Sequence, residues 1–131
     1  MRILMVSDVY FPRVNGVSTS IETFRRTLEG LGVEVRLVVP RYGDESEEAG
    51  VIRVAGRPVP GDPEDRLVGW TAMHRATLEA AGDCDLIHVQ TPFVAHYAGL
   101  KAARTLGLPV VATYHTLFEE YLQHYARLIP A

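Results

Sequence analysis

Cysteine is nearly absent from this chain, and long apolar runs are missing altogether. Cys84 is the only cysteine among 131 residues, so the chain forms no internal disulfide, and we interpret Cys84 as a small core residue. The apolar run at residues 3–6 is too short for a signal peptide, and no stretch approaches the ~20 apolar residues of a membrane span. These absences favour a protein of the reducing cytoplasm.

Strong positive charge and metal-ligand spacing are missing as well. The net charge is -3 and no basic stripe runs along the sequence, which argues against a nucleic-acid partner. His115 and Glu119 lie four residues apart, but one such pair does not define a metal site. We therefore expect neither nucleic acid nor metal.

Glycine-rich nucleotide motifs are also absent, although one glycine stands where such a motif would begin. The dinucleotide fingerprint needs three glycines, and only Gly16 follows the first apolar run, so we expect no cofactor. Asn15 and Gly16 nevertheless form a turn between a strand and a helix, where unpaired backbone N–H groups and the helix dipole attract a phosphate. The alternative is a turn glycine with no ligand.

The chain has the length and hydrophobicity of one domain, since 47% of its residues are hydrophobic and a domain of this size buries roughly two thirds of its unfolded surface. Runs rich in Val, Ile and Leu predict five strands, at residues 2–7, 33–39, 51–54, 85–90 and 109–113. Helical spacing of apolar residues predicts helices at 17–31, 62–81 and 93–106. This alternation predicts one α/β domain over residues 1–131, a Rossmann-like, doubly wound parallel sheet with strand order 3-2-1-4-5.

Capping signals set the expected ends of these helices. Thr19 and Glu22 have the spacing of a capping box at the start of the first helix, and Gly32 follows its end. Asp62, with a proline directly after it, is typical of a helix start. Gly107 marks the end of the third helix.

The strand order reverses between the first and fourth strands, and doubly wound sheets bind ligands at that crevice, beyond the carboxyl ends of the strands. Three loops meet there, at residues 8–16, 90–93 and 114–118. His88 lies inside an apolar strand, so we interpret it as a hydrogen-bonded core histidine. Asp8 has the position of a loop cap.

Three segments around this crevice carry a family pattern in the right order. The first segment contributes Asp8, Tyr10, Pro12, Asn15, Gly16 and Val17. The fourth strand reads Asp-Leu-Ile-His-Val-Gln-Thr-Pro from residue 85, and the fifth reads Gly-Leu-Pro-Val-Val-Ala-Thr-Tyr-His-Thr from residue 107. With these segments the chain resembles the amino-terminal domain of the family-four retaining GT-B glycosyltransferases, and it is similar to diacylglycerol glucosyltransferases and related mannosyltransferases.

The resemblance implies transfer of a sugar, with retention, from a nucleotide-sugar donor to a lipid, sugar or small-molecule acceptor. The resemblance supports His115 as the catalytic residue, where the alternative is a histidine bonded to a neighbouring carbonyl. Around the donor phosphate and the acceptor the expected residues are Asn15, Gly16 and Val17, with Thr91 and Thr116 added from their place at the crevice. In the family the second domain binds the nucleotide of the donor, and this sequence contains no segment that resembles it. We therefore expect an excised acceptor-side domain that is inactive alone and shares its donor with a missing carboxy-terminal domain.

Other interpretations stay open. A receiver-type signalling module has a similar sheet, but it needs an acidic pair after the first strand, an Asp after the third and a Lys after the fifth, where this chain has only Asp8, Gly56 and His115. A stand-alone subunit that docks onto a separate donor-binding chain fits the same sequence. The apolar face at residues 118–129 is typical of packing against this domain or its partner. Its alternative is peripheral contact with the inner face of a membrane, which Glu119 and Glu120 oppose.

Overall fold

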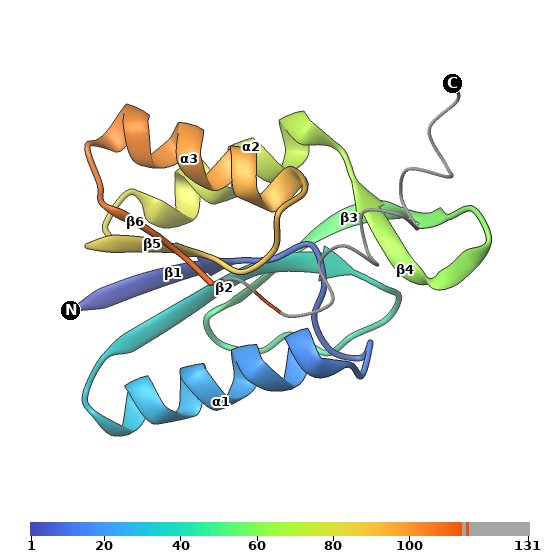
Figure 1. The fold of residues 1–131 in the computed structure, drawn as a ribbon, viewed down its shortest axis with the longest axis horizontal. Coiled ribbons are helices and arrows are strands. Elements are labelled where there is room, and N and C mark those ends of the chain that lie inside the picture. Colours follow the sequence, from blue (N-terminus) through green and yellow to red (C-terminus); the bar gives the residue numbers. More distant parts are fainter. Residues whose placement is uncertain (114, 116–131) are drawn as a thin grey trace.

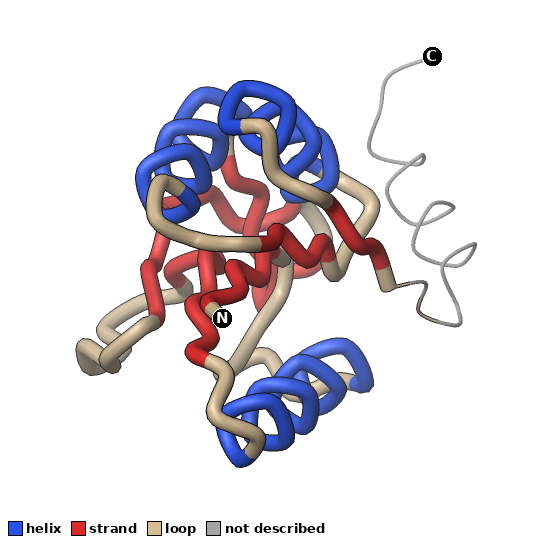
Figure 2. Tube along the Cα trace, turned by 90° about the vertical axis from the view of Figure 1, so that its left-hand side faces the viewer, coloured by secondary structure: helices blue, strands red, loops and turns tan. Residues whose placement is uncertain are grey.

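The described residues form one sheet of six strands, one more than expected. The computed structural model describes residues 1–113 and 115. The strands are β1 (Arg2–Val6), β2 (Glu34–Arg41), β3 (Val51–Val59), β4 (Asp62–Val68), β5 (Leu86–Val89) and β6 (Val110–Ala112). Helix α1 (Gly16–Gly30) covers one face, and α2 (Trp70–Ala81) and α3 (Val94–Leu106) cover the other (Figure 1). The view at right angles shows the same three layers (Figure 2).

The central part of the sheet confirms the doubly wound topology. The spatial order is β4-β3-β2-β1-β5-β6, and all neighbours from β3 to β6 pair in parallel. The five predicted strands are β1, β2, β3, β5 and β6, so their predicted order 3-2-1-4-5 is confirmed. β1 lies in the middle and is buried on both faces: Ile3 and Met5 pack on the side of α1, and Leu4 and Val6 on the side of α2 and α3. The loop after β1 therefore leaves from the centre of the sheet, between the two helix layers.

Helix α1 begins earlier than the capping box predicted. Asn15 is its N-cap, and the Asn15 Oδ1 accepts a hydrogen bond from the Ser18 N–H at 2.9 Å. Thr19 lies inside the first turn and donates its hydroxyl to the Asn15 carbonyl at 3.0 Å, so the expected Thr19–Glu22 capping box is wrong. The other end is confirmed, because Gly32 has a φ of 85° and donates its N–H to the Glu29 carbonyl, as a helix-ending glycine does.

The sequence prediction fails most clearly at residues 59–68. Asp62 does not open a helix; it begins β4, which pairs antiparallel with β3, and α2 begins only at Trp70. Gly61, with a φ of 81°, lies in the turn between the two strands. Antiparallel pairing satisfies backbone groups along the edge of β3 that a helix would leave open, and this long-range gain outweighs the local helix signal.

Among the described residues, no helix has the length and apolarity needed to cross a membrane. Cys84 is buried, 6% exposed, and its thiol donates to the Ala80 carbonyl at 3.3 Å, which confirms it as a core residue.

Helix α3 packs closely on the sheet through small residues. The end predicted at Gly107 is confirmed, since Gly107 is its left-handed C-cap with a φ of 69°. The buried residues of the helix are Ala95, Ala98, Gly99, Ala102 and Ala103. A Cβ added to Gly99 would lie 2.7 Å from the Val89 Cγ2, so the spacing between α3 and β5 depends on this glycine.

We expect Gly99→Ala to lower the free energy of unfolding by about 1–3 kcal/mol, because the new methyl group overpacks the contact with Val89. Gly30→Ala is the matched control: Gly30 also lies in a helix, but nothing stands within 4 Å of its added Cβ. That variant should instead gain up to ~1 kcal/mol of helix propensity. Urea unfolding measures both, and equal effects would contradict the packing argument.

Candidate functional site

Asp8 ties the loop after β1 to the start of α3. Its Oδ2 accepts a hydrogen bond from the Thr91 hydroxyl at 2.5 Å, and its Oδ1 accepts one from the Ala95 N–H at 3.1 Å. The Asp8 N–H in turn donates to the Thr91 hydroxyl oxygen at 2.7 Å. Phe93, the N-cap of α3, makes no side-chain cap bond, so Asp8 supplies that function from a distant part of the chain. Asp8 is thus a cap, as expected, but of a helix rather than of its own loop.

The electrostatics of Asp8 combine two opposed effects. Burial raises the pKa of the Asp8 carboxyl, while the Thr91 hydroxyl and the backbone N–H groups at the start of α3 favour its charged form and lower the pKa. Burial wins, so the pKa lies above its ordinary range. The Thr91 hydroxyl both donates to the Asp8 carboxyl and accepts from the Asp8 N–H. The assignment of Thr91 to ligand binding stays a prediction.

The first turn of α1 lies at the same edge of the sheet, directly after the β1 loop. The Asn15 side chain caps the helix, and Val17 is buried, 7% exposed, in the core beneath α1, so both contribute to the edge through their backbone. A Cβ added to Gly16 would meet no atom within 4 Å. Gly16 therefore leaves open space beside the helix N-terminus, as an anion site requires.

A second group of polar side chains runs from β5 to His115. The His88 Nε2 lies 2.5 Å from the Thr113 Oγ1, and the His88 Nδ1 lies 3.2 Å from the Gln90 Nε2. The Gln90 Oε1 lies 3.4 Å from the His115 Nε2. His88 is 8% exposed with both ring nitrogens paired, which confirms it as a hydrogen-bonded core histidine.

Burial governs both histidines of this group. It lowers the pKa of His88, and His115 adds to the effect as a second basic group. Burial also lowers the pKa of His115, and a hydrogen bond to the backbone of Gln90 acts in the opposite direction. Both imidazoles are therefore neutral near pH 7, as a hydrogen-bonding rather than a cationic role requires.

Two consecutive residues, Gln90 and Thr91, join the parts of the site. Gln90 contacts His115 from the third loop, and Thr91 contacts Asp8 from the first. Sequence reasoning missed Gln90 as a functional residue. The signal available was a polar amide directly after an apolar strand, two residues from a histidine. Thr116 and the apolar face at residues 118–129 lie outside the described residues.

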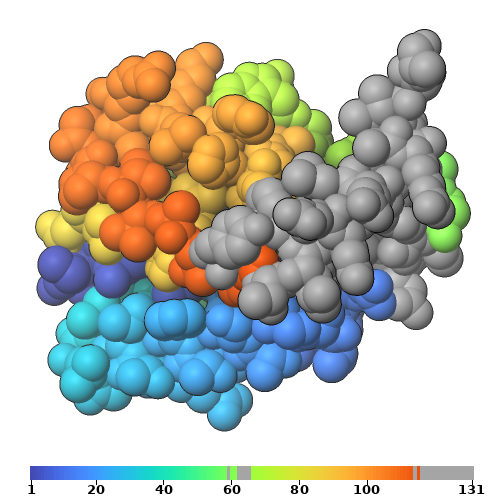
Figure 3. All heavy atoms as spheres, in the orientation of Figure 1, coloured from blue at the N-terminus to red at the C-terminus, as the bar shows by residue number. Residues whose placement is uncertain are grey.

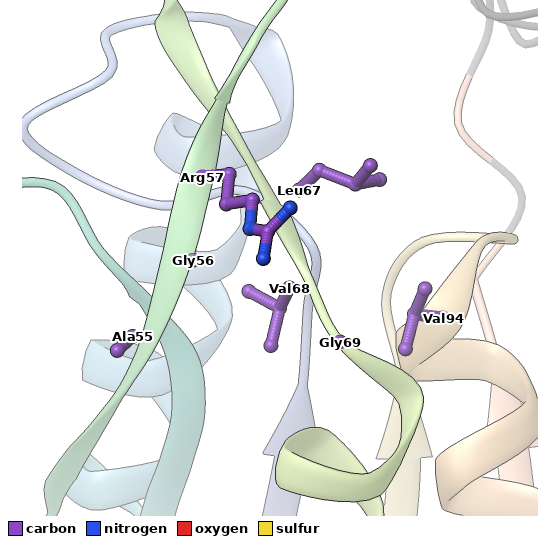
Figure 4. Close-up of a pocket in the computed structure, with 7 residues that line it drawn as sticks. All are labelled: Ala55, Gly56, Arg57, Leu67, Val68, Gly69 and Val94. Atoms are coloured by element: carbon purple, nitrogen blue, oxygen red, sulfur yellow. The ribbon is translucent and has the colours of Figure 1, made fainter.

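Sequence reasoning also missed an apolar groove between the β3–β4 hairpin and the start of α3. The groove has a volume of about 640 Å³ and is lined by Ala55, Gly56, Arg57, Leu67, Val68, Gly69 and Val94 (Figure 4). Among the lining residues that the structure describes, Arg57 is the charged one. The groove depends on β4, which was expected to be a helix, so the sequence pattern gave no sign of it. Its chemistry suits an apolar ligand with one anionic or polar end.

The other edge strand of the sheet is β6. β6 reaches the surface between the two helix layers (Figure 3), and Val111 is 47% exposed there.

Residues 14–130 match the family model described as Glycosyltransferase Family 4. The chain belongs to glycosyltransferase family 4. The matched range includes the site residues from Asn15 to His115, which lie beyond the carboxyl ends of the strands.

Curated relatives share most of this chain. The alpha-monoglucosyldiacylglycerol synthase of Streptococcus pneumoniae is 37% identical over 131 residues, which are 97% of this chain and 29% of that protein. A GDP-mannose-dependent alpha-mannosyltransferase of Mycobacterium tuberculosis is 32% identical over 88% of this chain and 32% of that protein. The chain thus spans about a third or less of the length of these family-4 relatives.

Solved structures support the fold. An alpha-glucosyltransferase in complex with UDP superposes with a TM-score of 0.59 at 16% identity, over 94% of this chain and 30% of that one. The family-4 chain therefore has the Rossmann-like fold of one half of a GT-B glycosyltransferase, as the sequence predicted.

The Asp8 tie makes a prediction for the pH dependence of stability. Because the folded pKa of Asp8 is raised, the folded protein holds the proton more tightly than the unfolded chain does. The free energy of unfolding of the wild type, relative to Asp8→Asn, should fall as pH rises from about 4, the ordinary carboxyl pKa, to the raised folded value. Urea unfolding at a series of pH values measures the difference.

Asp44→Asn is the control, because Asp44 is exposed. The Asp44→Asn exchange makes the same change of charge away from the Asp8–Thr91 contact. If the free energy of unfolding of the wild type, relative to Asp8→Asn, instead rose with pH, the fold would favour the carboxylate over its protonated form.

Proposed function

We propose that this chain is the acceptor-side domain of a retaining glycosyltransferase, which moves a sugar from a nucleotide-sugar donor to an acceptor hydroxyl. The observation that supports it most is the meeting of three elements at the carboxyl edge of the sheet. These are the open N-terminus of α1 at Gly16, the tie from Asp8 to Thr91, and the hydrogen bond between Gln90 and His115. Family membership and the names of the relatives, which include a glucosyldiacylglycerol synthase and GDP-mannose-dependent transferases, favour the same reaction.

In this proposal the backbone at Gly16 and Val17 binds the donor phosphate, because the first N–H groups of a helix have no internal partner and carry partial positive charge. Asn15 fixes the direction of that helix through its cap bond to Ser18. The neutral imidazole of His115 hydrogen-bonds a hydroxyl of the substrate. The rate enhancement comes from positioning and from stabilising the departing diphosphate, with no cofactor or enzymic nucleophile. Thr91 and Thr116 stay predicted ligand-binding residues.

The acceptor that we propose is a lipid. The apolar groove beside the β3–β4 hairpin, with Arg57 as its charged group, suits an acyl chain below a polar head (Figure 4). In this proposal the protein works in the cytoplasm with peripheral contact at the inner face of the membrane. In the same proposal the nucleotide is held by a carboxy-terminal domain, which accords with the chain spanning about a third or less of the length of its relatives.

The chain alone should therefore bind substrate but should not catalyse transfer of the sugar. We expect no transfer above background when it is incubated with labelled UDP-glucose or GDP-mannose and vesicles that contain diacylglycerol. Addition of a separate donor-binding chain that restored transfer would favour the stand-alone subunit, the second arrangement that the sequence allows. Robust turnover by residues 1–131 alone would contradict the proposal.

In the complete transferase, His115→Ala should lower kcat about a hundred-fold, the scale of one lost proton-transfer or hydroxyl contact. Gly16→Leu should lower kcat/KM at least about ten-fold, because its side chain fills the open space at the helix N-terminus and costs the phosphate its charge-assisted hydrogen bonds. Steady-state assays with donor in excess measure both.

Gly30→Leu is the matched control, since Gly30 lies at the other end of α1 with open space around it. It should keep the wild-type rate, and circular dichroism should show all three variants folded. Wild-type rates for His115→Ala and Gly16→Leu would remove these residues from the site.

A further inference from the structure

Four polar side chains form an unbroken row from β6 to His115. The row runs from the Thr113 hydroxyl through the His88 ring and the Gln90 amide to the His115 ring, with heavy-atom distances of 2.5, 3.2 and 3.4 Å. Gln90 has no exposed surface, and His88 is 8% exposed. Buried polar groups need partners, so each member of the row constrains the next.

The amide of Gln90 gives the row a direction. Its NH₂ group faces the His88 Nδ1, and an amide nitrogen only donates, so this ring nitrogen carries no proton. The proton of the neutral His88 ring is therefore on Nε2, which donates to the Thr113 hydroxyl oxygen. At the other end the Gln90 Oε1 only accepts, so the His115 Nε2 carries a proton and donates to it.

Backbone hydrogen bonds and a neighbouring ring hold members of the row in place. The Gln90 N–H donates to the Val6 carbonyl at 2.9 Å, and the Thr113 N–H donates to the Val89 carbonyl at 3.0 Å. The Phe24 ring packs edge-on against His88, with 5.9 Å between ring centroids. Thr113 and Gln90 are therefore both held by the sheet, between β1, β5 and β6.

We infer that Gln90, oriented by His88, is a positioning residue for His115: it holds His115 as the Nε2–H tautomer and leaves Nδ1 as the hydrogen-bond acceptor. This inference rests on the proposed function, in which His115 meets the substrate. An acceptor nitrogen suits a substrate hydroxyl, which can donate, and it does not suit a phosphate oxygen, which cannot. The row thus assigns His115 to a hydroxyl group and leaves the phosphate to the N-terminus of α1.

The test reads the tautomers directly by NMR of the chain with ¹⁵N-labelled histidine, at a pH where the rings are neutral. In the wild type, His88 and His115 should both show a protonated Nε2 and an unprotonated Nδ1. Gln90→Met keeps the side-chain length but removes the amide, so the His115 signals should move toward the average of the two tautomers. A protonated Nδ1 on His115 in the wild type, or an unchanged tautomer in Gln90→Met, would overturn the inference.

Gln90→Glu gives a second signature that does not depend on loss of packing. Both oxygens of a carboxylate accept hydrogen bonds, so the proton of the neutral His88 ring should move from Nε2 to Nδ1. The His115 Nε2 should keep its proton. Phe24→Leu is the control: it removes the ring that packs on His88 but no hydrogen bond, and should leave both tautomers as in the wild type. The signals of His74 and His96 report on the fold in every variant.

The link to catalysis is tested separately, in the complete transferase. Gln90→Met should lower kcat about ten-fold, the scale of one lost hydrogen bond, and leave the KM for the donor nearly unchanged. A wild-type kcat for Gln90→Met, with kcat lost in His115→Ala, would overturn the positioning role. If His115→Ala itself kept the wild-type rate, the proposed site would fail, and the tautomers measured by NMR would still decide the arrangement of the row.

Discussion

The hydrogen bond between the Asp8 carboxylate and Thr91 is the interaction on which the carboxyl edge of the sheet depends. A carboxyl group largely shielded from water is costly unless its oxygens are paired, and here a hydroxyl and the N-terminus of α3 pair them. Because Asp8 follows the central strand, one side chain fixes the loop that leads to α1 and the start of α3 together. The position of Gly16 relative to Gln90 follows from that junction.

The two edges of the sheet use charge in different ways. At the amino edge, Arg2 and Arg36 both pair with Asp83 on the surface, where ion pairs are screened and contribute little stability. At the carboxyl edge, the polar groups are buried and paired by hydrogen bonds, as in the row that ends at His115. A largely buried, hydrogen-bonded arrangement is rigid, which is what a site that works by positioning needs.

The sequence predicted the parallel core of the fold because strands buried on both faces and helices with one apolar face leave clear periodicities. It failed at Asp62, whose local signal favoured a helix, because pairing with β3 is a long-range interaction that no local window contains. It also failed at Thr19, since the capping-box spacing was present but Asn15 capped the helix one turn earlier. The groove at the β3–β4 hairpin was lost with the first of these errors.

The sequence by itself determined the class of the fold, its strand order, the family, and the three loops in which the polar residues stand. Hydrophobic period and turn residues are local properties, and they carry that much. Only the tertiary structure decided that Asp8 caps a helix 87 residues away and that Gln90 lies between two histidines. These contacts join separate strands, and their energies come from burial and hydrogen-bond geometry that exist only after the sheet has assembled.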